Sequence, residues 1–119
     1  MTIDSKQIAE AFSTHQFATA YPYLSDQIEW NMIGGEVIRG KEAVIETCDQ
    51  SSMYLSTVKT TFNKFKTFVG ENSVVIDSLA AYIDEKNNKS VVASCDIYEF
   101  QNGMLQAITS YTVEIAQTS

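Results

Sequence analysis

Residues 90–115 read SVVASCDIYEF, QNG and MLQAITSYTVEI, and this stretch decides the fold class. Its first and last segments are rich in β-branched and aromatic residues, which predicts strands at 90–100 and 104–115 joined by a tight turn. Two more strands are predicted at 60–69 and 73–84, and EKNNK at residues 85–89 suits a hairpin turn because Asn accepts a positive φ. Long strands joined by short turns predict an antiparallel meander.

Two helical patterns open the chain. The first predicted helix begins after a cap at Asp4 or Ser5 and ends near residues 14–16, with apolar residues on one side. Glu10 lies too far along to complete a capping box with that cap. A shorter helix is predicted over residues 17–24, where a proline would kink it unless it falls in the first turn.

A strand pair and a third helix separate these helices from the meander. IEWNMI at 28–33 alternates as a half-buried strand, and EVIRG at 36–40 is predicted to return beside it. The third helix opens at Gly40 and frays between residues 51 and 56. Helices segregated from an antiparallel sheet predict the α+β class, with a strongly bent sheet that leaves a cavity against the helices. A chain of 119 residues suits one domain, spanning residues 1–119.

Composition and charge narrow the classes of function. Hydrophobic residues make up 45% of the chain and proline occurs once, as in a globular protein. The net charge of −7 argues against nucleic acid or an anionic membrane as the main partner. The sequence contains neither an apolar run of about 18 residues nor a secretory signal, so we expect a cytoplasmic protein without a membrane span. Cys48 and Cys95 are expected to be reduced, small core residues.

Asp96 stands in the middle of the predicted strand at 90–100, where a carboxylate is costly. Strand alternation places it on one face with four other residues, a mixture of acid, hydroxyl and aromatic groups that is typical of a pocket wall: Val92, Ser94, Tyr98 and Phe100. The other face is mostly small and aliphatic, and suits packing or a subunit contact. We therefore expect Asp96 to face a cavity, where burial raises its pKa. It would then act as a neutral hydrogen-bond donor or as a general base, or its role would be structural alone.

WNMIGGEVIRGKEAV at 30–44 and DIYEFQNGMLQAITSY at 96–111 resemble segments of the NTF2-like superfamily, in particular its SnoaL-like branch. Members of this group include ketosteroid isomerase, limonene epoxide hydrolase and polyketide cyclases. The resemblance implies a cone-shaped α+β barrel with three N-terminal helices packed in a strongly bent antiparallel sheet. It also implies a mostly apolar pocket at the wide end of the cone and, commonly, a homodimer formed by sheet faces.

The resemblance to ketosteroid isomerase is limited to one acid. Asp96 lies four places before Phe100, as the oxyanion-binding acid of that enzyme lies before a Phe. The position of its general base, nine places before Gly40, holds Asn31, and the first helix has no tyrosine to match the oxyanion-binding one. Steroid isomerisation by that mechanism is therefore not expected. Arg39 is the one arginine and lacks the flanking acids of the epoxide hydrolase pattern.

Other candidate site residues keep two interpretations. Trp30 and Met32 either line the cavity or fill the core, and Tyr54 either closes the pocket or is a surface aromatic. His15 is either a cation stabilised by the end of the first helix or a partner of Asp96 at the cavity mouth. Both faces of the strand that holds Asp77 are apolar, and we favour an outward Asp77. The resemblance adds three residues of the last strand to the pocket wall: Ile108, Ser110 and Thr112.

The sequence predicts a protein that binds a small apolar molecule without a metal or organic cofactor. If it is an enzyme, we expect proton-transfer chemistry such as isomerisation, cyclisation, dehydration or hydrolysis. Asp96 would be the acid–base group, assisted by Tyr98, Ser94 or His15. The alternatives are a non-catalytic ligand-binding or dimeric interaction module, which the amide at Asn31 favours, and a protein whose cavity is filled by side chains.

Overall fold

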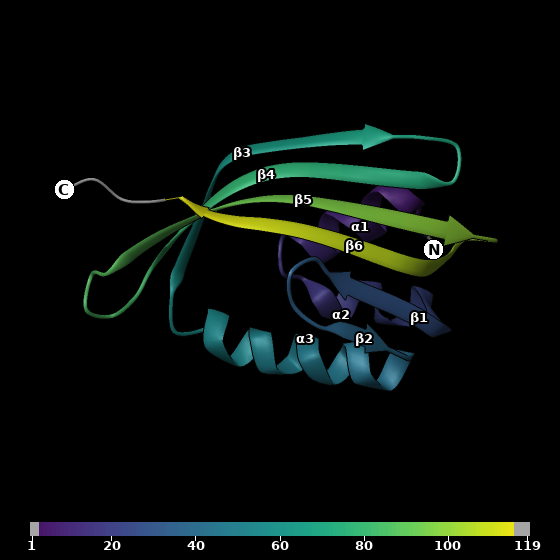
Figure 1. The fold of residues 1–119 in the computed structure, drawn as a ribbon, viewed down its shortest axis with the longest axis horizontal. Helices are drawn as coiled ribbons and strands as arrows, with labels where there is room; N and C mark the ends of the chain where they lie inside the picture. Colours follow the sequence, from purple (N-terminus) through teal and green to yellow (C-terminus); the bar gives the residue numbers. More distant parts are fainter. Residues whose placement is uncertain (1–2, 116–119) are drawn as a thin grey trace.

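A computed structural model describes residues 3–115 as three helices and a six-stranded sheet (Figure 1). The elements in chain order are α1 (Ser5–Ser13), α2 (Phe17–Ala20), the 3-10 turn η1 (Tyr21–Tyr23), β1 (Leu24–Met32), β2 (Val37–Arg39), α3 (Lys41–Leu55), β3 (Lys59–Val69), β4 (Ser73–Ile83), β5 (Lys89–Gln101) and β6 (Met104–Ile115). The α+β class and the three helices are confirmed. None of the helices within the described residues has the length and apolarity needed to span a membrane.

The sheet is mixed, which corrects the expectation of a purely antiparallel one. Its strand order is β2-β1-β6-β5-β4-β3, and β3 to β6 form the predicted antiparallel meander. β1 runs parallel to β6, with Trp30 opposite Ile108. The chain leaves the sheet after β2, crosses through α3 and re-enters at the far edge with β3, so its first and last long strands meet side by side. Because β2 and β3 do not pair, the sheet is a curled, open one rather than a closed barrel.

The start of α1 differs in detail from the prediction. Asp4 accepts a hydrogen bond from the backbone N–H of Gln7, and the Gln7 side chain accepts one from the backbone N–H of Asp4. This is a capping box completed by Gln7 at the third helical position, and not by Glu10. The second helix is a single turn, and Pro22 lies in the 3-10 turn that follows, where its missing N–H costs little.

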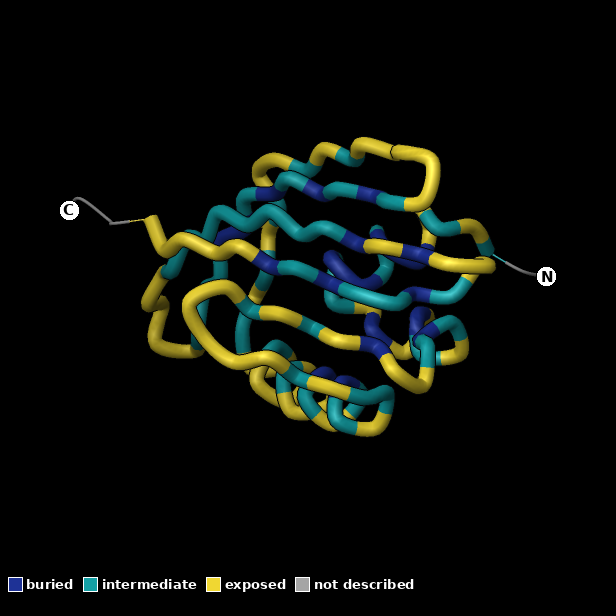
Figure 2. Tube along the Cα trace, turned by 45° about the vertical axis from the view of Figure 1, so that its right-hand side comes forward, coloured by how far each residue is buried: buried dark blue, intermediate teal, exposed yellow. Residues whose placement is uncertain are grey.

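The core lies where α1, α2 and the first turns of α3 meet the inner face of the sheet. Figure 2 shows the buried residues gathered there, while the hairpins and most of β3 are exposed. The largest side chains with almost no exposed area include Ile8, Leu24, Ile28, Ile76, Tyr98, Leu105 and Ile108. Cys48 is in this core as expected, but Cys95 is half-buried and lies on the opposite face of β5 from Asp96, because strand alternation turns it outward.

Candidate functional site

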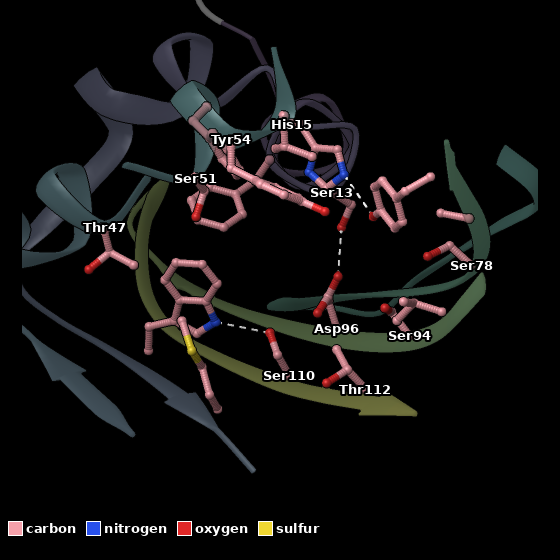
Figure 3. A pocket seen from close by; sticks show the side chains of 18 of the residues that line it. Ser13, His15, Thr47, Ser51, Tyr54, Ser78, Ser94, Asp96, Ser110 and Thr112 are labelled. Carbon is pink, nitrogen blue, oxygen red and sulfur yellow. Dashed lines mark hydrogen bonds between the residues drawn. The ribbon is translucent and has the colours of Figure 1, made fainter. Parts of the chain in front are cut away.

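A cavity of about 740 Å³ lies between the inner face of the sheet, the end of α1 and the second half of α3 (Figure 3). This volume is within the usual range for pockets that hold small ligands. Its apolar wall consists of Phe12, Phe17, Met32, Leu55, Phe62, Ala80 and Val92. Hydroxyl groups also face it, among them those of Thr47 and Ser51 on α3 and Ser78 on β4, within a lining whose surface is mostly apolar.

β5 supplies the central part of the lining. Val92, Ser94, Asp96 and Tyr98 face the cavity in strict alternation. Phe100, the fifth residue of the predicted set, does not. It lies in the core with 7% of its surface exposed, just beyond a register shift between β5 and β6 at Glu99 and Phe100. Strand alternation therefore places residues on the correct face but does not show where the cavity ends and the core begins.

β6 and β1 form the adjoining wall. Ser110 and Thr112 line the cavity. Ile108 was also expected to line it, but it is 1% exposed and lies in the core, as Phe100 does. Trp30 and Met32 face the cavity from β1. Both Ile108 and Phe100 belong to the core cluster that also contains Ile8, Phe12 and Phe17 of α1 and α2, so that side chains fill the space there.

α3 closes the remaining side. Tyr54 belongs to the lining, yet 61% of its surface is exposed, which places it at the mouth rather than inside. Only Val44 and Cys48 of this helix are buried, and apart from Thr47 the α3 residues that line the cavity all follow them. The second half of α3 therefore borders open space instead of packing on the sheet.

Asp96 is the end point of two chains of hydrogen bonds. The hydroxyl of Ser13, at the last residue of α1, donates to Asp96 Oδ2 over 3.1 Å (Figure 3). It also lies 2.5 Å from the hydroxyl of Tyr98. Since Ser13 has one hydrogen and uses it for Asp96, Tyr98 must be the donor in the second bond. Trp30 Nε1 donates to Ser110 Oγ over 2.9 Å. Ser110 stands directly across the β5–β6 pair from Asp96, so its own hydrogen is free to turn to the carboxyl.

The carboxyl group of Asp96 is held in conditions that favour its proton. Burial raises the pKa of Asp96, and the hydroxyls of Ser110 and Ser13 partly oppose that rise by donating to the charged form. The pKa of Tyr98 is raised well above its usual value, first by burial and then by the charge of Asp96, so Tyr98 remains a neutral donor. The site therefore holds one carboxyl that can exchange a proton nearer neutrality than an exposed Asp.

His15 lies in the cavity, but not as a cation. Its backbone is left-handed, with φ 69°, immediately after the capping residue of α1, and this conformation turns the ring inward. Its Nε2 lies 3.1 Å from the hydroxyl of Tyr82. Burial lowers the pKa of His15, which corrects the expectation of a charge stabilised by the helix end. Its hydrogen-bond partner in the structure is Tyr82 and not Asp96.

Asp77 faces away from the cavity, as favoured. It forms an ion pair with Lys64 over 2.8 Å on the outer face of the sheet. Asn31 is likewise exposed and is not a lining residue. Sequence reasoning missed Ser13 and Tyr82. Ser13 does carry a signal, because it lies four residues after Ala9 on the buried side of α1, where a polar residue needs a partner. Tyr82 carries none, because both faces of its strand are apolar.

The ionisable residues of the cavity do not form a metal site. Within residues 3–115, no three His, Cys, Asp or Glu side chains are grouped so as to hold a metal ion. The lining contains two acids, Asp96 and the exposed Glu114, and neither lysine nor arginine. The site thus offers acid–base and hydrogen-bonding groups on an aromatic frame.

Comparisons with known proteins agree with this fold. A scan against protein-family models gave no match, and neither did a search of curated proteins. Among solved structures, an NTF2-like protein of unknown function from Cytophaga hutchinsonii is 34% identical. The match covers 90% of this chain and 94% of that one, with a TM-score of 0.80.

Two more distant structures share the fold alone. A candidate SnoaL-like polyketide cyclase from Mesorhizobium loti is 17% identical over 89% of this chain and 93% of its own, with a TM-score of 0.62. A protein with a ketosteroid isomerase-like fold from Catenulispora acidiphila, in complex with trimethylamine, is 10% identical over 92% and 86%, with a TM-score of 0.69. On the 34% identity over nearly the whole of both chains, this protein belongs to the NTF2-like superfamily.

Proposed function

We infer that the protein binds a small molecule in this cavity and catalyses a proton transfer on it, with Asp96 as the acid–base group. The observation that carries the proposal is the carboxyl of Asp96, which is half-buried, faces the cavity and accepts its hydrogen bond from the wall. A group of this kind is both a stronger base and a more available acid near neutral pH than an exposed carboxylate.

Tyr82 on β4 supplies a second polar group to the cavity. The hydroxyl of Tyr82, paired with the neutral ring of His15, can donate a hydrogen bond to a substrate oxygen on which negative charge develops. Tyr82 also keeps its proton, because burial and then the charge of Asp96 raise its pKa. Asp96 would remove a proton from carbon and return it elsewhere on the substrate. Isomerisation, cyclisation and dehydration all contain such a step.

The body of the ligand is expected to be apolar, with at least one polar group. Phe12, Phe17, Phe62 and Met32 form a surface that buries a hydrocarbon or aromatic skeleton, and the serines and threonines opposite orient its polar group. The same fold holds trimethylamine in the Catenulispora acidiphila protein, so amines are one ligand class to test in this cavity.

A non-catalytic binding module is the second candidate. It is favoured by the absence of a second buried acid among the lining residues, since Glu114 is exposed at the mouth. A homodimer belongs to either proposal. Its interface would be the outer face of the sheet, where Tyr111 and Val113 are exposed on β6, and Val113→Glu should convert it to a monomer in light scattering. An unchanged mass, or a monomeric parent protein, would reject this interface.

The test of catalysis measures proton exchange directly. The protein is incubated in D₂O with a panel of enolisable ketones and imines, and deuterium incorporation is followed by proton NMR. We expect Asp96→Asn to slow the exchange of the accepted class by about 10²- to 10⁴-fold, the usual contribution of a general base. Asp77→Asn is the matched control, because it makes the same change one strand away on the outer face.

Two results would count against catalysis. Equal exchange rates for the protein and Asp96→Asn would reject Asp96 as the base. Absence of exchange for the whole panel, together with a molecule found bound to the purified protein by native mass spectrometry, would favour the binding module instead.

A further inference from the structure

The charges that face the cavity are all of one sign. Asp96 and Glu114 are its acids, and His15 is neutral because burial lowers its pKa. The ion pairs found within residues 3–115, Lys64 with Asp77 and Arg39 with Glu29, are both outside the lining. Because no lysine or arginine lines the cavity, the carboxylate form of Asp96 has hydroxyl donors but no cation opposite it.

Aromatic rings stand on both sides of this carboxyl. Phe12 packs edge-to-face on Trp30 and Tyr98, with ring centres 5.1 and 5.9 Å apart, and these two partners are the ones hydrogen-bonded into the Asp96 network. Across the cavity, the His15 ring lies 5.8 Å from Phe62 and 6.0 Å from Tyr82. The face of an aromatic ring is electron-rich and attracts a cation, so rings and carboxylate select for the same charge.

The hydrogen-bond directions agree with this selection. The indole of Trp30 can only donate, and Tyr98 must donate, so both chains of hydrogen bonds deliver hydrogens to Asp96. These hydrogen bonds partly stabilise the carboxylate form of Asp96, but burial still raises its pKa. A buried anion without a cation is costly, and a positively charged ligand would remove that cost on binding.

We propose that the ligand of this cavity carries a positively charged nitrogen, as a protonated or quaternary amine, held between Asp96 and the aromatic rings. This rests on the proposed function of the site and names the class of its ligand. A positive nitrogen also withdraws electrons from neighbouring C–H bonds, which makes their protons easier for a carboxylate to remove. Apart from Asp96, the titratable groups that face the cavity are His15 after α1, Tyr54 on α3, Tyr82 on β4, Tyr98 on β5 and Glu114 on β6.

A pair of compounds of equal shape and different charge tests the proposal. (3-Hydroxyphenyl)trimethylammonium and 3-tert-butylphenol differ only in a nitrogen for a carbon, and both are small enough for a cavity of about 740 Å³. Binding is measured by titration calorimetry and by shifts of the Trp30 indole NMR signal, which reports on the cavity itself because the chain has one tryptophan. We expect the cation to bind at least about tenfold more tightly than the neutral compound, because it gains cation–π contacts with the rings and an attraction to the Asp96 carboxylate.

Variants and pH assign that preference to Asp96. Asp96→Asn should reduce the preference to less than about threefold, whereas Asp77→Asn, with the same loss of charge on the outer face, should keep it. The affinity for the cation should fall as the pH is lowered through the raised pKa of Asp96, and the affinity for the phenol should not.

Three results would overturn the proposal. If 3-tert-butylphenol binds as tightly as the cation, the cavity takes neutral ligands, and its role in binding and proton transfer stands without the charge. If Asp96→Asn keeps the preference for the cation, Asp96 is not its source. If neither compound shifts the Trp30 signal, this ligand class is wrong, and the deuterium-exchange rates of Asp96→Asn still decide the proposed function independently.

Discussion

The hydrogen bond between Ser13 and Tyr98 should have an energetic signature that a double-mutant cycle can isolate. Tyr98 has none of its surface exposed, and its hydroxyl bonds to Ser13. Ser13→Ala leaves that hydroxyl buried without an acceptor, which costs about 1–3 kcal/mol of unfolding free energy. Tyr98→Phe removes the hydroxyl itself, and Ser13 still donates to Asp96, so the loss is only about 0.5–1.5 kcal/mol.

The double variant is the informative one. With both hydroxyls gone, no buried hydroxyl is left without a hydrogen-bond partner. Adding Tyr98→Phe to Ser13→Ala should therefore leave the unfolding free energy unchanged or raise it. The cycle should therefore show a coupling of roughly 0.5–3 kcal/mol, in which the double variant is more stable than the sum of the single changes implies. The effect of Ser13→Ala on the pKa of Asp96 is present in both the single and the double variant, so it cancels in the coupling.

Urea denaturation at constant pH, followed by far-ultraviolet circular dichroism, measures all four proteins. In a domain of this size, each 1 kcal/mol also shifts the melting temperature by about 4 °C, which gives an independent check. The control is an m-value common to the four proteins, which shows that the unfolded state has not changed. Additive losses, within about 0.3 kcal/mol, would refute the proposed direction of the network from Tyr98 through Ser13 to Asp96.

Three further predictions concern titration and packing. Asp96 has a folded pKa above its ordinary value of 3.8, so the folded state loses stability as the pH rises from 3.8 to the folded pKa. In urea denaturation, Asp96→Asn should therefore be more stable than the parent near pH 7 and no more stable below pH 3.8; a constant difference at all pH values would contradict this. His15 has a folded pKa below 6.5, so the NMR titration of this one imidazole should have its midpoint below 6.5, and a higher midpoint would mean that the ring is charged in the fold. Ile108→Ala should cost about 2–5 kcal/mol of unfolding free energy because the side chain is enclosed, whereas Thr112→Ala on the same strand should cost under about 1 kcal/mol because it already borders open space; equal costs would show that the cavity is filled.

Local sequence patterns predicted the faces of the strands well. Alternation along residues 90–100 correctly places Asp96 and Cys95 on opposite faces of the strand. It succeeds because polar and aromatic residues gather on one face and small, aliphatic residues on the other. For Asp77, alternation could not decide by itself, since both faces of β4 are apolar. The preference for an outward Asp77 agrees with its ion pair to Lys64, a partner on the neighbouring strand that no local pattern reveals.

Long-range features were beyond the reach of the sequence. The parallel pairing of β1 with β6 depends on the path of the chain around α3, and a strand pattern contains no information about its partner. The boundary between core and cavity, which excludes Phe100 and Ile108, depends on how closely the helices approach the sheet. Ser13 becomes a site residue only because the end of α1 is brought to β5 from the opposite end of the chain.

The parallel contact between β1 and β6 has a consequence for the order in which the molecule assembles. Strands joined by hairpins can pair early, but β1 must wait for a strand from the far end of the chain, at a high cost in loop entropy. During synthesis, β5 emerges before β6 and presents an unpaired edge in the meantime, which is a template for wrong association. We therefore expect the nascent chain to be most prone to aggregation just before β6 pairs with β5 and β1, when the cavity still lacks one wall.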